Sequence, residues 1–236
     1  MINVNNCRKT FTLHLQGGAQ LPVLEHASFS IMPGECVALT GHSGAGKSTL
    51  MRMIYGNYLA DGGSIQVDGT EIVGASPRTI LALRRSTLGY VSQFLRVVPR
   101  VPTLDVVAEP LVTLGVAVED ARARAGDLLT RLSLPHALWS LPPATFSGGE
   151  QQRINIARGL IHRYPALLVD EPTASLDRAN RQVVLDLIGE AKAEGAAILG
   201  IFHDLEARAA VCDREVDVSA FLPGRSPSAH TEPASA

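Results

Sequence analysis

The sequence contains few of the features that mark secreted, membrane-spanning or nucleic-acid-binding proteins. Its three cysteines, Cys7, Cys36 and Cys212, are widely spaced and include no C-x-x-C pair. We therefore expect neither a disulfide framework nor a zinc site, and a reducing cytoplasm fits best. No apolar run approaches the roughly 18 residues of a membrane span, and the first residues lack the charged-then-apolar profile of a signal peptide. A formal net charge of −2 gives no sign of a nucleic-acid binder.

What the chain does contain is ordinary globular material, because 46% of its 236 residues are hydrophobic. This predicts one large domain, or one domain with a subdomain. Residues 41–49 read GHSGAGKST and fit the G-x-x-x-x-G-K-[ST] phosphate loop. An apolar run at 36–39 predicts a buried strand before this loop. The helical spacing of Leu50, Met51 and Ile54 predicts a helix after it.

A loop between a strand and a helix N-terminus directs backbone N–H groups at an anion. Gly44 and Gly46 would allow the backbone to approach phosphate oxygens closely. We expect Lys47 to reach the β- and γ-phosphates of a nucleotide, and the Ser48 hydroxyl to ligate Mg²⁺. For the loop taken alone, a chance match is the alternative. The candidate phosphate-binding residues are Gly41, His42, Ser43, Gly44, Ala45, Gly46, Lys47, Ser48 and Thr49.

The regions on either side of the loop favour β-structure and one capped helix. Residues 1–35 predict antiparallel strands, because polar and apolar residues alternate at 11–15 and 27–31. Phe11 lies early in this sheet, where it would either stack on an adenine ring or belong to the core, and periodicity does not decide between the two. A further strand and turn are predicted at 64–69, and a helix from Pro77 with an N-cap serine before it.

Residues 94–146 predict two helices without a strand between them, which indicates a helical insert in an α/β domain. A helix is expected from Thr103, and Pro110 should kink or end it; a second helix is expected at 118–132. Arg96 and Arg100 could form a partner surface, but a solvated basic face is the favoured interpretation.

The segment FSGGEQQR at 146–153 predicts a second anion site. A hydroxyl and two glycines at a helix N-terminus offer N–H groups and the positive end of the helix dipole. The alternative is a simple serine N-cap, which would explain Ser147 but not Gly148 and Gly149.

Three strands are each predicted to deliver polar residues at their carboxyl ends, where ligand sites of α/β folds lie. Gln93 follows a strand at 88–92, and it matters only if a γ-phosphate lies nearby. Asp170 and Glu171 end a buried strand, where one carboxylate can hold Mg²⁺ through water and the next can polarise an attacking water. His203 follows a strand at 196–202 and is better interpreted as a γ-phosphate contact than as a structural histidine.

These motifs, in this order, resemble the ATP-binding-cassette ATPases over residues 1–222. The resemblance rests on GHSGAGKST at 41–49, Gln93, FSGGEQQR at 146–153, LLVDEP at 167–172, SLD at 175–177 and His203. It implies a single α/β domain of P-loop type at 1–222. That domain would have a RecA-like core, an N-terminal antiparallel β subdomain and a helical subdomain at about 94–160, followed by a disordered tail at 223–236.

The same resemblance implies a head-to-tail pair of such chains, identical or paralogous, that encloses two ATP molecules with Mg²⁺. The loop of one chain would face Ser147, Gly148, Gly149 and Glu150 of the other, and ATP would favour the closed pair. Glu171 would act as general base, His203 would touch the γ-phosphate, and Asp177 would lie at the interface. Ser48, Gln93 and Asp170 would hold the metal, Gln93 would couple the site to the helical insert, and Phe11 would stack on adenine. Phe146 and Glu150 depart from the usual leucine and glutamine.

Within the family, the chain looks most like the L-type ATPase subunit of the bacterial carbon–phosphorus lyase, which degrades phosphonates. The segments SQFLRVVPRV at 92–101, TFSGGEQQRINIARG at 145–159, YPALLVDEPTASLD at 164–177 and GAAILGIFHD at 195–204 carry this likeness. It implies a cytoplasmic ATPase grouped with α-D-ribose 1-methylphosphonate 5-triphosphate synthase and with soluble lyase subunits as partners. The alternative is the energising subunit of a membrane transporter (lipoprotein release, macrolide export or phosphonate import), with a coupling groove around 94–110. A DNA-maintenance ATPase is disfavoured, because no long insertion separates Lys47 from Ser147.

Overall fold

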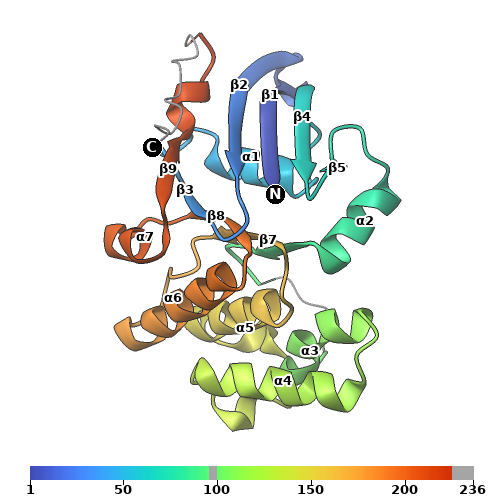
Figure 1. Cartoon of the computed structure of the whole chain (residues 1–236), viewed down its shortest axis with the longest axis vertical. Helices are drawn as coiled ribbons and strands as arrows, with labels where there is room; N and C mark the ends of the chain where they lie inside the picture. Colours follow the sequence, from blue (N-terminus) through green and yellow to red (C-terminus); the bar gives the residue numbers. More distant parts are fainter. Residues whose placement is uncertain (96–99, 225–236) are drawn as a thin grey trace, which may run out of the picture.

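The computed structural model describes residues 1–95 and 100–224, and it contains two β-sheets with helices between and below them (Figure 1). The antiparallel sheet has the strand order β2-β1-β4-β5. Its strands are β1 (Ile2–Leu13), β2 (Ala19–Ile31), β4 (Gly62–Val67) and β5 (Thr70–Glu71). The second sheet has the order β6-β7-β8-β3-β9, and its strands pair in parallel. They are β3 (Cys36–Thr40), β6 (Leu88–Val91), β7 (Ala166–Asp170), β8 (Ala197–Ile201) and β9 (Arg214–Asp217).

The antiparallel sheet confirms the alternation predicted for the N-terminal region, with one correction. β1 pairs with β2 through Ile2 opposite Ile31, and with β4 through Ile2 opposite Val67. The predicted strand at 11–15, however, ends at Leu13. Residues His14–Gln16 form a 3-10 turn instead, because Gly17 and Gly18 adopt positive φ values of 67° and 78° and reverse the chain there.

Apart from its edge strand β9, the parallel sheet is buried on both faces, as its continuous apolar strands predict. In β3, Cys36 and Ala38 pack in the same core cluster as the helical subdomain, whereas Val37 and Leu39 pack with the antiparallel sheet. Strand β9 was not predicted; it lies at the edge of the sheet beside β3.

Within residues 1–95 and 100–224, four helices lie outside the helical subdomain. They are α1 (Lys47–Ile54), α2 (Pro77–Ser86), α6 (Arg178–Ala193) and α7 (Leu205–Val211). The described residues also form 3-10 turns at His136–Leu138, Pro143–Thr145 and Val218–Phe221.

The helical subdomain occupies the lower part of Figure 1 and consists of α3 (Thr103–Thr113), α4 (Val118–Arg131) and α5 (Gly148–Leu160). Helix α3 continues three residues past Pro110, so this proline does not end it. Helix α6 begins at Arg178, because Asp177 accepts a hydrogen bond from the Asn180 backbone and caps it. Arg96 lies outside the described residues, as does the predicted tail from 225 onward.

Two cysteines that are far apart in the sequence meet in the fold. The Sγ atoms of Cys36 and Cys212 lie 3.5 Å apart, at hydrogen-bond distance, and all three cysteines are free thiols. Among the described residues, no helix combines the length and apolar character that crossing a membrane requires.

Candidate nucleotide-binding site

Four adjacent strands bring the predicted site residues to one edge of the parallel sheet. In the order β6-β7-β8-β3, the carboxyl ends lead to Gln93, to Asp170 with Glu171, to His203, and to the glycine loop at 41–46. Parallel strands place all their carboxyl ends at the same edge, where α/β proteins bind ligands. The topology therefore unites four motifs that are separated by up to 162 residues in the chain, from Gly41 to His203.

The glycine loop has the backbone that an anion site needs. Gly46 is the N-cap of α1, with a φ of 97°, and no side chain caps this helix. The first N–H groups of α1 are thus left for an external acceptor. A Cβ on Gly41 would lie 2.9 Å from Oγ of Ser219, so only glycine fits there. Lys47 donates from Nζ to the carbonyl oxygens of Gly41 (2.7 Å) and His42 (3.0 Å), which holds its ammonium group over the loop.

The two carboxylates after β7 occupy different environments. Asp170 is buried and accepts a hydrogen bond from the Tyr90 hydroxyl at 3.2 Å; burial, with Glu171 adding a smaller contribution, raises its pKa. Glu171 is less buried and has a φ of 52°, a left-handed backbone that costs a non-glycine residue about 1–2 kcal/mol. Such strain is held by the surrounding structure and is common at functional sites.

Glu171 gathers the other two predicted catalytic residues around its side chain. His203 donates from Nε2 to Oε1 at 2.7 Å, since a carboxylate can only accept. Gln93 donates from Nε2 to Oε2 at 3.2 Å. The structure thus brings Glu171, His203 and Gln93 into one hydrogen-bonded cluster, and their catalytic roles stay predictions.

One residue of this site was not singled out from the sequence. The buried Gln152 on α5 donates to the carbonyl oxygens of Glu171 and Pro172, each at 3.3 Å. These bonds attach the strained turn at Glu171 to helix α5, whose N-cap is Ser147. Only its place in the FSGGEQQR segment could have pointed to Gln152, because its partners lie 19 and 20 residues away.

The predicted second anion site is an exposed helix tip. Ser147 caps α5 through a capping box, in which its Oγ accepts from Glu150 N and Glu150 Oε2 accepts from Ser147 N at 2.8 Å. The Ser147 hydroxyl also donates to Glu150 at 2.7 Å, and these bonds lower the pKa of Glu150. The simple serine N-cap is therefore present, but it does not account for both glycines. A Cβ on Gly149 would lie 3.2 Å from the Ser175 carbonyl oxygen, whereas one on Gly148 would meet nothing within 4 Å.

Two further predicted residues lie apart from the carboxylate cluster. Asp177 is exposed and caps α6, with a pKa lowered mainly by the hydrogen bond from the Asn180 backbone. Phe11 is neither a core residue nor fully exposed, and its ring meets the edge of Tyr58 at a centroid distance of 5.4 Å. Stacking on adenine stays a prediction for Phe11.

The oxygen donors at this site suit a hard divalent cation. The Asp170 carboxylate, the Ser48 hydroxyl and the side-chain oxygen of Gln93 are the ligand types that Mg²⁺ prefers. Gln93 and Asp170 line the same cavity, of about 290 Å³. The residues present therefore fit a nucleotide held with Mg²⁺.

That cavity adjoins a larger one, of about 460 Å³, and the two form a groove between the core and the helical subdomain. They share Tyr55, Tyr90, Asn155 and Arg158 as lining residues. We call them together the interdomain groove; its outer part is lined by side chains of α2 and α3, namely Leu81, Arg84, Arg85, Glu109, Pro110 and Thr113.

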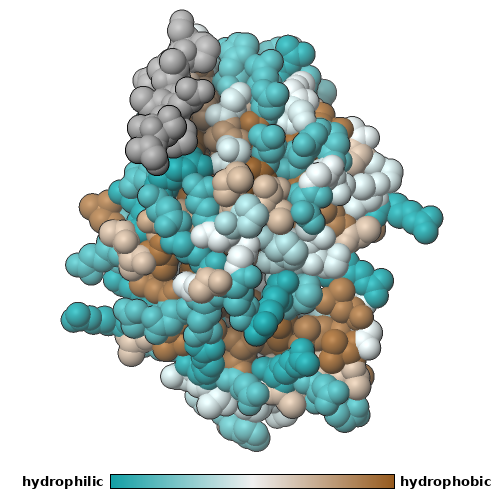
Figure 2. Space-filling model, in the orientation of Figure 1, coloured by the Kyte–Doolittle hydropathy of each residue, from teal (hydrophilic) through white to brown (hydrophobic). Residues whose placement is uncertain are grey.

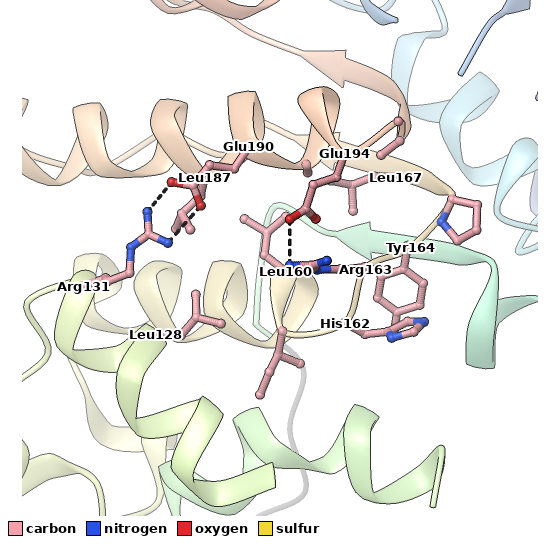
Figure 3. A pocket seen from close by; sticks show the side chains of 15 residues that line it. Leu128, Arg131, Leu160, His162, Arg163, Tyr164, Leu167, Leu187, Glu190 and Glu194 are labelled. Atoms are coloured by element: carbon pink, nitrogen blue, oxygen red, sulfur yellow. Dashed lines mark hydrogen bonds and ion pairs between the residues drawn. The ribbon is translucent and has the colours of Figure 1, made fainter. Parts of the chain in front are cut away.

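A third cavity, of about 410 Å³, lies among α4, α5 and α6 (Figure 3). Ion pairs cross its rim from Arg131 to Glu190 (2.6 Å) and from Arg163 to Glu194 (2.9 Å). Its described lining includes none of the predicted site residues.

Comparisons with known proteins agree with this geometry. The family model described as "ABC transporter" matches residues 24–174. The chain is 37% identical over 212 residues to the lipoprotein-releasing system ATP-binding protein LolD of Bordetella avium, covering 89% of this chain and 91% of that protein. It is 38% identical over 207 residues to the macrolide export ATP-binding/permease protein MacB of Syntrophobacter fumaroxidans, covering 86% of this chain but only 28% of that longer protein.

Solved structures show the same fold. The dimeric structure of MJ0796, a bacterial ABC transporter cassette, superposes with a TM-score of 0.84 at 26% identity, covering 93% of this chain and 95% of that chain. A post-hydrolysis dimer of MJ0796 bound to ADP and Pi gives the same values. The glycine loop, the carboxylate cluster and the exposed helix tip are thus arranged on the fold of a nucleotide-binding cassette. The chain belongs to the ABC transporter family, whose cassettes bind ATP with Mg²⁺ and hydrolyse it.

Proposed function

We propose that this chain is the nucleotide-binding subunit of a membrane ABC transporter of the lipoprotein-release or macrolide-export kind, acting at the cytoplasmic face. The main support for a transporter subunit is the 37% identity to LolD over 91% of that protein's length. The relatives reported above are named for macrolide export and for lipoprotein release. They give no support to a carbon–phosphorus lyase subunit, so the transporter alternative fits better than the phosphonate interpretation.

The chemistry we assign to this chain's residues follows from their positions. Lys47 and the loop N–H groups bind the phosphates of ATP, and Glu171 accepts a proton from the attacking water. His203 and Gln93 hold the Glu171 carboxylate from both sides. Mg²⁺, held by Ser48, Gln93 and Asp170, would neutralise charge on the phosphate oxygens.

The exposed tip at Ser147 supports assembly with a second cassette, identical or paralogous. Gly148 faces open space, so nothing within its own chain requires a residue without a side chain there. An uncrowded helix N-terminus can approach the γ-phosphate held by another chain's Lys47. ATP would then favour the closed pair, and hydrolysis would remove that preference.

The interdomain groove could connect a membrane partner to the residues of the nucleotide site, because it extends from α2 and α3 to Gln93 and Asp170. Figure 2 shows hydrophobic surface between α2 and α3, and the exposed side chains in this region include Leu81, Phe94 and Val112. The inner part of the groove reaches Gln93, which donates to Glu171. A cytoplasmic segment of the transporter that fills the groove would therefore contact Gln93, which is hydrogen-bonded to the proposed general base Glu171.

Purification of the tagged chain from detergent-solubilised membranes of its own host tests this proposal. We expect a multi-span membrane protein to copurify and to change the ATPase rate. The Leu81→Glu substitution should release it, because Leu81 is 64% exposed and lines the groove. Leu15→Glu is the matched control, since Leu15 is fully exposed on the β1–β2 hairpin.

One outcome would overturn the transporter assignment, and another would overturn only the groove as the docking site. One is recovery of soluble phosphonate-lyase subunits in place of a membrane protein, which would restore the carbon–phosphorus lyase interpretation. The other is a membrane partner that Leu81→Glu and Leu15→Glu release equally, which would remove the groove from the account.

A further inference from the structure

One carboxylate ties the start of α7 to the start of α6. Asp204 follows His203 directly and caps α7, because its Oδ1 accepts from the backbone N–H groups of Glu206 (2.9 Å) and Ala207 (3.4 Å). Its other oxygen, Oδ2, contacts the guanidinium of Arg181 on the first turn of α6. The backbone that carries His203 is thus held from two helices at once.

His203 depends on that backbone for its position. Its side chain is 72% exposed, and the one hydrogen bond that its ring makes within the described residues runs to Glu171. An exposed ring with a single partner has little packing to orient it. The position of the backbone at His203 and Asp204 therefore decides whether the imidazole reaches the Glu171 carboxylate.

The arrangement at Arg181 is poorly explained by stability alone. Its ion pair with Asp204 is partly exposed, with side-chain exposures of 36% and 26%, and such pairs contribute little to folding. Its Nε is buried without a hydrogen-bond partner among the described residues, which is unfavourable. A planar guanidinium does fix the direction of a carboxylate well.

The first turn of α6 also connects Arg181 to a second part of the site. The backbone N–H of Arg181 donates to the Asp177 carbonyl at 2.9 Å, and Asp177 is the N-cap of α6. A continuous set of contacts thus runs from Asp177 through Arg181 and Asp204 to His203 and on to Glu171.

We propose that Arg181 is a positioning residue for ATP hydrolysis, which holds Asp204 and so sets the orientation of His203 toward Glu171. This inference rests on the roles proposed above for His203 and Glu171. It predicts that loss of Arg181 lowers kcat for ATP and leaves KM nearly unchanged, because the nucleotide-binding loop is not touched.

The test is a double-mutant cycle on the full chain, with ATPase kinetics and unfolding temperature measured for each variant. We expect Arg181→Ala to lower kcat about tenfold, as displacement of a catalytic group does. In a His203→Ala background, the same change should lower kcat less than about twofold further, since Arg181 acts through His203. Asp204→Asn, which keeps a capping side chain, should reproduce the loss, and Arg181→Lys should restore part of it.

Arg208→Ala is the matched control. It removes the ion pair from Arg208 to Glu215 (2.9 Å) at the other end of α7, and kcat should stay within about twofold of the parent. The proposal is overturned if Arg181→Ala keeps the parental kcat, if its loss multiplies with that of His203→Ala, or if Arg208→Ala causes an equal loss. A parental rate in His203→Ala itself would instead overturn the site assignment, and this proposal with it.

Discussion

The substitution Gln152→Leu tests the hydrogen bonds that support the Glu171 turn. Leucine has a volume similar to that of glutamine but donates no hydrogen bond, so the carbonyl oxygens of Glu171 and Pro172 lose the bonds from Gln152. The Glu171 carbonyl oxygen still accepts from the Ala174 backbone N–H at 3.2 Å. Both bonds from Gln152 measure 3.3 Å, slightly longer than the usual range of about 2.7–3.2 Å, so we take about 0.5–1 kcal/mol for each and about 1–2 kcal/mol in total. For a chain of this size, that lowers the unfolding temperature by about 2–8 °C.

The same change should also slow hydrolysis. Without Gln152, the left-handed backbone at Glu171 can relax, and a displaced general base costs about tenfold in kcat. Thermal unfolding and steady-state ATPase measurements give both quantities. Gln182→Leu is the control, because Gln182 is exposed on α6 and its side chain donates to Asp186 on the same helix. If Gln152→Leu unfolds within about 1 °C of the parent and keeps its kcat, the supporting role is refuted.

Four further outcomes follow from the structure. Lys47→Ala should abolish ATP hydrolysis in a phosphate-release assay, and retention of the parental rate would remove the loop from the site. Glu171→Gln should bind ATP as the parent does but hydrolyse it about 10²–10⁴ times more slowly, whereas an unchanged rate would exclude Glu171 as general base. Burial acts to raise the pKa of Glu71, but hydrogen bonds from the Ser64 hydroxyl and nearby backbone N–H groups outweigh it and lower this pKa below its usual 4.5. This stabilisation is present above the unfolded pKa and is lost as pH falls through the folded one. Glu71→Gln should therefore reduce the acid-side loss of unfolding temperature, and an identical pH profile would contradict this. Burial raises the pKa of Cys7 to about 11, so iodoacetamide at pH 8 should alkylate this thiol only after unfolding. Rapid labelling of Cys7 itself in the native chain, located by peptide mass analysis, would refute its burial.

Local patterns were enough to predict much of the fold. The glycine loop between a buried strand and a helix needs only residues 36–54, and the cap at Ser76 needs only its neighbours. The buried strands β7 and β8 could be recognised as short apolar runs because both faces of the sheet are covered. Recognition of the family then placed Gln93, Glu171 and His203 in one site, and the structure brings their side chains together.

Features that depend on distant partners could not be predicted in this way. Strand β9 has a mostly polar, exposed sequence at the sheet edge, and it is a strand because it pairs with β3. Gln152 looks like any polar helix residue until the Glu171 turn is placed against it. Cys36 and Cys212 are 176 residues apart, and their contact follows from the pairing of β3 with β9.

The central claim is that ATP joins two cassettes, with the Lys47 loop of one chain facing the Ser147 tip of another. Light scattering after size exclusion, applied to Glu171→Gln with ATP and Mg²⁺, tests it most directly. We predict a dimer for Glu171→Gln with ATP and monomers without it. We also predict that adding Gly148→Arg prevents the dimer while ATP binding persists, because a bulky side chain blocks the exposed helix tip at a position that faces open space in its own chain. A Gly148→Arg, Glu171→Gln double variant that dimerises with ATP as well as Glu171→Gln does would contradict the account.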